Sequence, residues 1–204
     1  MAITLHHGDI PADIDFGDVV AVDAEMMGLN PMRDRLCLVQ LSSGDGNAHL
    51  VKFSKDDSFA APNLKNLLAD PDVVKIFHFA RKDIAVLWTY LEVMTAPVFC
   101  TKIASRLTRT FTDHHSLKTI CKDMLNVELS KQQQSTDWGA DELTKEQLEY
   151  AASDVYHLHK LKDLFDAMLA REGRVDLAHA CFDFLPVRAM LDAAGWEEED
   201  IFAH

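Results

Sequence analysis

The apolar residues of this chain change from strand-like to helix-like spacing near residue 60. Before that point, three runs rich in β-branched or alternating apolar residues are separated by turn-forming residues, including Gly44, Asp45 and Gly46. Such runs predict β-strands, and the short connection between the second and third predicts a hairpin. The three predicted strands cover residues 18–25, 35–43 and 48–53.

After residue 60, most apolar residues recur at helical spacing, and two short apolar runs predict further strands. The first helix is punctuated by proline, since its segment starts at Pro62 and stops before Pro71. Ser116 has the side chain expected of a helix N-cap. The predicted helices cover residues 62–71, 80–91, 101–108 and 116–126, and the predicted strands cover 74–79 and 98–100.

The longest predicted helix begins near Thr144, where Thr-Lys-Glu-Gln is close to a capping-box pattern, and runs to about Arg171. A further helix is predicted within 174–194. Three successive strands, followed by helices that alternate with two more strands, predict an α/β fold. We therefore expect a mixed five-stranded sheet flanked by helices, with a C-terminal helical extension.

The composition is that of one globular domain, since 48% of the 204 residues are apolar. No apolar run reaches the roughly 18 residues that suggest a membrane span, and the N-terminus has no basic region of a secretory signal. The four cysteines lie far apart without a CxxC pair, which predicts free thiols. Together these features predict a cytoplasmic protein that does not bind a membrane.

The net charge of −13 argues against a broad nucleic-acid-binding surface, because phosphate contacts normally need Lys and Arg. It does not argue against a small acidic site in which divalent cations meet the phosphate. Acids but no Lys or Arg follow Arg188, and a solvated C-terminal tail is the ordinary interpretation of that run.

Asp23 and Glu25 are two residues apart at the end of a predicted strand, so their side chains point to the same face. Two carboxylates inside an apolar run repel each other unless a cation lies between them. Oxygen ligands favour Mg²⁺ or Mn²⁺ over Zn²⁺. The ordinary alternative is that both acids reach solvent at the strand end.

Three later residues complete the candidate chemistry. Tyr150 and Asp154 lie four apart on the longest predicted helix and therefore share a face, with Asp154 near the apolar stripe. Asp83 falls in the first turn of the helix after the strand at 74–79. Taken singly, Asp83 fits an acid at a helix N-terminus, and Asp154 fits a surface acid beside a half-buried tyrosine.

The order of these motifs resembles that of the DEDDy exonucleases. VDAE is similar to their first motif, FHFARKD to their second and LEYAASDVYHL to their third. The stretch LSKQQQSTDW and the strand RLCLVQLSS also resemble the catalytic domain of ribonuclease D, and the similarity runs from about residue 15 to about residue 170. Glu149 stands where the His-type sister group has its histidine, so the chain resembles the Tyr type.

This resemblance implies a ribonuclease H-like (DnaQ-like exonuclease) fold and a 3′-5′ exonuclease that releases 5′-mononucleotides. Two divalent cations, Mg²⁺ or Mn²⁺, are the implied cofactors. The implied catalytic residues are Asp23, Glu25, Asp83, Tyr150 and Asp154, in which the four acids hold the metals and the tyrosine orients the attacking water. We expect the exonuclease domain to cover residues 1–172 and the C-terminal extension, with its acidic tail, 173–204.

The C-terminal helical RNA-binding domains of ribonuclease D are missing, and a compact chain of this kind resembles nanoRNase C of alphaproteobacteria. That resemblance implies hydrolysis of very short oligoribonucleotides, down to dinucleotides, and a ring-shaped homo-oligomer such as an octamer. Three alternatives stay open: trimming of tRNA or other structured RNA, a DNA 3′-5′ exonuclease, and an inactive nuclease fold that serves as a nucleic-acid-binding scaffold. The last is disfavoured because all four acids and the tyrosine are present.

Several residues near the motifs are candidates for binding the substrate. Apolar side chains beside the acids suit stacking or wedging of bases, with core packing as the alternative; these are Met26, Met27, Leu29 and Phe79. His78 lies beside the second motif, and Lys131, Gln133 and Trp138 lie in the segment before the third motif. Basic residues at positions 33, 35, 81, 82, 102, 106 and 109 are candidate phosphate contacts, most of which are expected to be solvated.

Overall fold

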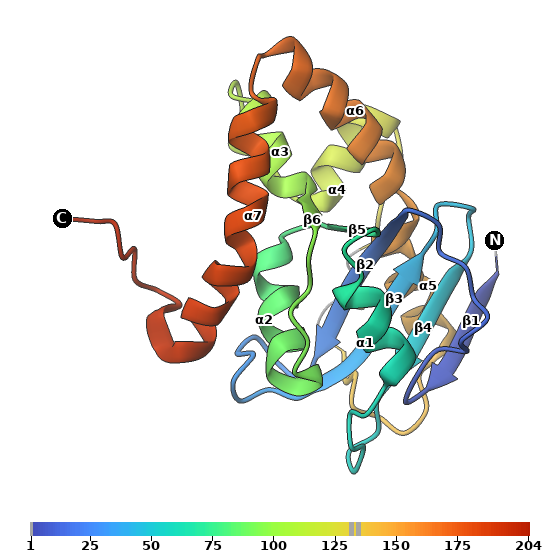
Figure 1. The fold of residues 1–204 in the computed structure, drawn as a ribbon. Coiled ribbons are helices and arrows are strands. Elements are labelled where there is room, and N and C mark those ends of the chain that lie inside the picture. Colours follow the sequence, from blue (N-terminus) through green and yellow to red (C-terminus); the bar gives the residue numbers. More distant parts are fainter. Residues whose placement is uncertain (1, 131–132, 134–135) are drawn as a thin grey trace.

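The protein, described by a computed structural model for residues 2–130, 133 and 136–204, contains one mixed sheet with helices packed around it (Figure 1). The described sheet has six strands in the order β1-β4-β3-β2-β5-β6. Strands β2, β3 and β4 form an antiparallel meander, whereas the pairs β1–β4, β2–β5 and β5–β6 are parallel. The strands are β1 Ile3–His7, β2 Val19–Met26, β3 Leu36–Ser42, β4 Ala48–Lys52, β5 Val74–Phe77 and β6 Val98–Cys100.

The predicted α/β class is confirmed, and the sheet has one strand more than the five predicted. The additional strand is β1, which pairs with β4 in parallel from Ile3↔Ala48 to His7↔Lys52. Its sequence, ITLHH, carries only two strongly apolar residues and is half-buried or exposed at the sheet edge. A short edge strand of this kind lacks the apolar run from which the other strands were predicted.

The helices follow the predicted pattern closely. Ser116 caps its helix by accepting from the backbone N–H of Thr119, and Thr144 and Gln147 form a full capping box. The one long helix predicted from Thr144 is two helices, because the backbone bends at His157 (φ −104°, ψ −5°). The described helices are α1 Pro62–Ala69, α2 Ala80–Leu91, α3 Thr101–Thr108, α4 Leu117–Ile120, the π-helix η1 Cys121–Leu125, α5 Lys145–Tyr156, α6 Leu158–Arg171, α7 Val175–Leu191 and the π-helix η2 Asp192–Trp196.

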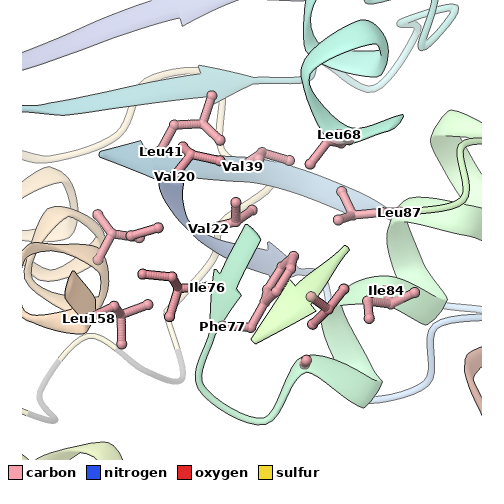
Figure 2. Close-up of a cluster of buried hydrophobic side chains, with 14 of the residues drawn as sticks. Val20, Val22, Val39, Leu41, Leu68, Ile76, Phe77, Ile84, Leu87 and Leu158 are labelled. Atoms are coloured by element: carbon pink, nitrogen blue, oxygen red, sulfur yellow. The ribbon is translucent and has the colours of Figure 1, made fainter. Parts of the chain in front are cut away.

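The core lies on both faces of β2, which is the central strand between β3 and β5. Figure 2 shows Val20 and Val22 of β2 among apolar side chains from β3, β5 and the helices on either side. Truncating one such side chain to Ala typically costs about 2–5 kcal/mol, because the surrounding structure only partly fills the cavity. The strand that carries the first acidic motif is thus anchored in the core by its buried residues Val20, Ala21 and Val22.

The C-terminal helix α7 packs along α2 and also contacts α3, α6 and β6 (Figure 1). The chain then turns through η2 and ends away from the sheet. Whether residues 173–204 form a separate extension stays a prediction. Within the described residues, no helix combines the length and the apolar character needed to span a lipid bilayer.

Candidate active site

The acidic residues of the three motifs meet at the end of β2. Asp23 and Glu25 come from this strand, and Asp154 comes from α5, which packs against β2 and β3. One carboxylate oxygen from each of these three residues lies within 4.8 Å of the others. The described part of the chain thus brings together three carboxylates, from two distant sequence motifs, that could hold a metal ion.

Asp83 lines the same cleft and comes from the start of α2. The parallel strand β5 ends beside β2, and α2 begins three residues later with Asp83 in its first turn. The residue before the helix, Phe79, has a left-handed backbone (φ 74°), which turns the chain sharply from strand to helix. Parallel pairing of β5 with β2 and this tight turn therefore place Asp83 beside β2, where its carboxylate accepts from the backbone N–H of Ala24.

A cleft of about 310 Å³ contains the four acids and Tyr150. Lysine and serine side chains also line it, so the same cleft contains both acidic and positively charged groups. The additional lining residues are Ala24, His78, Phe79, Lys82, Lys102, Ser116, Leu117, Lys118, Leu129 and Ser130.

The acids are strongly perturbed because they are removed from water and repel one another. Burial, followed by the charges of Asp83, Asp154 and Glu25, raises the pKa of Asp23 well above its usual range. The pKa of Asp83 is likewise raised, mainly by burial. Burial and the charges of Asp154 and Asp83 raise the pKa of Glu25 to about 9, and burial raises that of Asp154 to about 7. Burial and mutual repulsion thus disfavour the charged forms of these acids, as expected of a site that a cation completes.

Tyr150 lies one helical turn before Asp154 and is hydrogen-bonded to it. Burial and the charge of Asp154 raise the pKa of the Tyr150 phenol, so its hydroxyl stays protonated and acts as a hydrogen-bond donor. Its ring centroid is 6.0 Å from that of the buried Trp138, which packs against it. The hydroxyl is thus held toward the acids by packing behind its ring.

These residues and their surroundings match a known family of enzymes. A family model described as 3′-5′ exonuclease matches residues 10–170. The chain belongs to the 3′-5′ exonuclease family. The ordered acids and the tyrosine that predicted this family therefore lie inside the matched region.

Within this family, two curated relatives are similar over most of this chain. Ribonuclease D of Nitrobacter hamburgensis is 29% identical over 89% of this chain and 53% of the relative. Ribonuclease D of Gluconacetobacter diazotrophicus is 33% identical over 77% of this chain and 39% of the relative. The chain thus spans about half or less of the length of these relatives.

Solved structures in the comparison include a full-length match. NrnC of Brucella melitensis bound to pGG is 54% identical with a TM-score of 0.96, covering 100% of this chain and 99% of that one. The same protein with bound Mg²⁺ is 52% identical with a TM-score of 0.95, covering 100% of both chains. RNase D of Escherichia coli, 23% identical with a TM-score of 0.73 over 89% of this chain and 48% of that one, shares the fold.

Some of the residues predicted to bind substrate line the cleft, and others do not. His78 and Phe79 line the cleft. Met26 is half-buried, whereas Met27 and Leu29 follow β2 on a loop and are 52% and 84% exposed outside the cleft lining.

The candidates from the segment before the third motif lie elsewhere. Trp138 is buried behind Tyr150 and does not line the cleft, and its Nε1 has no hydrogen-bond partner in the described part of the structure. Gln133 is half-buried outside the cleft lining. Lys131 lies outside the described residues. Contacts of all these residues with substrate stay predictions.

His78 is held as a neutral side chain beside the acids. Its Nδ1 is 2.9 Å from Thr101 Oγ1. Burial and the charge of Lys102 lower the pKa of His78 to about 3, so the imidazole is uncharged at neutral pH. It can therefore form hydrogen bonds with a substrate but does not neutralise a phosphate.

Sequence reasoning missed Gln40, which lies directly opposite Asp23 in the β2–β3 pairing. Its Nε2 donates to Asp23 Oδ2 at 3.4 Å, and the residue is fully buried. The signal was available, because a glutamine inside the apolar run LCLVQLS needs a buried partner. Ser116 and Lys118 were also missed as cleft residues, since α4 approaches the site only through the tertiary fold.

The perturbed acids predict an effect on the metal-free protein. The pKa of Glu25 is near 9 in the folded state and near 4.5 in a free side chain. A raised folded-state pKa means that stability is lost as pH rises from about 4.5 toward about 9. In chelator at pH 8, Glu25→Gln is therefore expected to melt above the wild type, with each kcal/mol relieved worth about 2–4 °C.

Thermal melts at pH 5 and pH 8, each with and without Mg²⁺, measure this effect. The difference in melting temperature between variant and wild type is expected to shrink at pH 5. At pH 8 it is expected to reverse when Mg²⁺ is added. If the variant melts below the wild type at pH 8 in chelator, the charged Glu25 carboxylate does not destabilise the metal-free protein and the prediction is wrong. Glu149→Gln, an exposed position on α5, is the matched control.

Proposed function

We propose that this chain is a metal-dependent 3′-5′ exoribonuclease that hydrolyses very short oligoribonucleotides, including dinucleotides, to 5′-mononucleotides. The observation that carries the proposal is the cluster of Asp23, Glu25 and Asp154, with Asp83 and Tyr150 in the same cleft. Support for the short substrate comes from the full-length similarity to NrnC, whose structure was solved with pGG.

The chemistry of the four acids fits divalent cations. Buried carboxylates with raised pKa values have no cationic partner on β2 or α5, and carboxylate oxygens are the ligands of Mg²⁺ and Mn²⁺. We assign Asp23, Glu25 and Asp154 to one ion, and Asp83, together with Asp23, to a second. The similar NrnC structure with bound Mg²⁺ supports this choice of metal. When bound, such ions lower the pKa of water and neutralise charge on the phosphate.

The remaining work falls to residues of this chain. Tyr150, which stays protonated and is hydrogen-bonded to Asp154, orients the attacking water through its hydroxyl. Lys102 and Lys118 line the cleft and meet the negative charge of the phosphates, which offsets the net charge of −13 locally. The departing group is the 3′ oxygen of the preceding nucleotide, so the released product carries a 5′ phosphate.

A chain-length series tests the proposal. RNA substrates from two nucleotides upward, each with a 5′ phosphate, are incubated with Mg²⁺, and initial rates are measured beside equivalent DNA and a 3′-extended tRNA. The proposed function predicts the highest kcat/KM on the dinucleotide. Equal or higher kcat/KM on the extended tRNA supports ribonuclease D-like trimming instead, and a preference for DNA assigns the chain to DNA degradation.

Two further features belong to this proposal. A ring-shaped homo-oligomer is proposed from the same resemblance, and light scattering of the purified protein measures the number of subunits. A location in the cytoplasm, where short RNA fragments arise, is proposed with it. Exposed apolar side chains on α7, among them Leu177, Val187 and Met190, are consistent with a surface that packs on a neighbour.

A further inference from the structure

The C-terminal segment 192–199 is bound to the two residues that immediately precede Asp83. Asp192 accepts two hydrogen bonds from Arg81, at 2.5 Å from Nε and 2.7 Å from Nη2. Arg81 also donates to the backbone carbonyl of Glu197, and Lys82 pairs with the Glu197 carboxylate. Residues more than 100 positions apart in the sequence are thereby joined at the first turn of α2.

Asp192 is the centre of this contact. Its side chain is only 2% exposed and is shared between Arg81 and Arg188, whose Nη2 lies 2.9 Å away. Arg188 also donates to the backbone carbonyls of Trp196, Glu197 and Glu199. One buried carboxylate therefore pairs with two arginines. Arg188 makes hydrogen bonds within the C-terminal segment, whereas Arg81 connects that segment to α2.

The start of α2 has no side-chain cap of its own. The residue at the N-cap position, Phe79, has a left-handed backbone and makes no capping hydrogen bond. Helix ends without caps fray, and Asp83 lies in this first turn. Arg81 and Lys82 hold this turn to the C-terminal segment, while the Asp83 carboxylate accepts from the backbone N–H of Ala24 on β2.

We propose that Asp192 is a positioning residue that, through Arg81, holds Asp83 in place to bind its cation. This inference rests on the proposed function. Asp192 does not line the active-site cleft, so it acts without touching the substrate. The C-terminal segment accordingly helps to position Asp83 in addition to packing on the core.

Two arginines that share Asp192 provide a matched test. Arg81→Met breaks the link to α2, whereas Arg188→Met loosens the C-terminal segment but leaves the Arg81–Asp192 pair. Removing an outer contact that orients a metal ligand typically weakens metal affinity by about 10–100-fold.

We expect Asp192→Asn and Arg81→Met to raise the Mg²⁺ concentration for half-maximal activity by about tenfold. KM for the dinucleotide at saturating Mg²⁺ is expected to stay within about twofold, because Asp192 makes no substrate contact.

A second readout does not depend on turnover. The rise in melting temperature on titration with Mg²⁺ is expected to need about tenfold more metal in Asp192→Asn and Arg81→Met, and no more metal than wild type in Arg188→Met. Asp192→Glu and Arg81→Lys retain the charges and serve if the first variants do not fold. Asp166→Asn, which removes an ion pair with Lys162 on α6, is the control.

The outcomes separate this inference from the proposed function. Loss of stability with an unchanged Mg²⁺ requirement in Asp192→Asn and Arg81→Met overturns the positioning role. An equal increase in all three variants also overturns it, because it makes Arg81 no more important than Arg188. Absence of dinucleotide hydrolysis by the wild type refutes the proposed function, while the Mg²⁺-dependent melts still test the positioning of Asp83.

Discussion

Replacing Asp23 by Asn is expected to lower kcat/KM on a 5′-phosphorylated RNA dinucleotide by about 10³-fold, the largest effect of any substitution considered. The charges of Asp83, Asp154 and Glu25 all act on Asp23, and we assign this acid to both proposed ions. Its loss removes a shared ligand of both proposed ions, which are worth several kcal/mol of transition-state stabilisation. About 4 kcal/mol corresponds to about 10³ in rate.

The measurement is steady-state hydrolysis of the dinucleotide over a range of Mg²⁺ concentrations. Asp18→Asn is a matched control, because Asp18 is an exposed acid just before the same strand. It is expected to retain wild-type kinetics. If Asp23→Asn retains more than about a tenth of the wild-type kcat/KM at saturating Mg²⁺, the ligand assignment is wrong.

The local part of the site was predictable from sequence. A strand places residues two apart on one face, and a helix places residues four apart on one face. The pairs Asp23 with Glu25 and Tyr150 with Asp154 therefore follow from spacing alone. Their meeting in space followed only from the resemblance, since spacing within one element does not determine which elements pack together.

The unpredicted parts depend on contacts between distant segments. The bend at His157 interrupts a continuous apolar stripe, so periodicity alone extended the helix across it. Trp138 lies in the segment before the third motif that was expected near the substrate, and the fold buries it behind Tyr150. The pairing of Arg81 with Asp192 joins a helix start to the acidic tail, where a solvated surface was the ordinary expectation.

Gln40 shows that one of these contacts had a sequence signal. A polar residue within a fully buried strand needs a hydrogen-bond partner, and its register opposite Asp23 supplies one. The remaining oxygen of Gln40 has no partner in the described part of the structure. Strand pairing was therefore the missing information, because the hairpin register decides which acid the glutamine faces.

The second large effect is expected from Tyr150→Phe, which removes only the hydroxyl from the cleft. We expect kcat to fall by about 10²-fold, the usual loss on removing one well-placed hydrogen-bond donor from a reacting centre. Because burial and neighbouring acids raise the pKa of Tyr150, the phenol is a donor and not a base. The variant should therefore lower the pH–rate profile without changing its shape.

The pH dependence of kcat from pH 6 to pH 10, measured for wild type and variant, distinguishes the roles of this tyrosine. Tyr156→Phe removes a hydroxyl from the same helix outside the cleft and is expected to behave as wild type. A limb of the profile that disappears in Tyr150→Phe means that the phenol ionises during turnover, which contradicts a protonated orienting group. A pH–kcat profile that is lowered but unchanged in shape supports the proposed mechanism, in which the acids and their cations activate water and Tyr150 orients it.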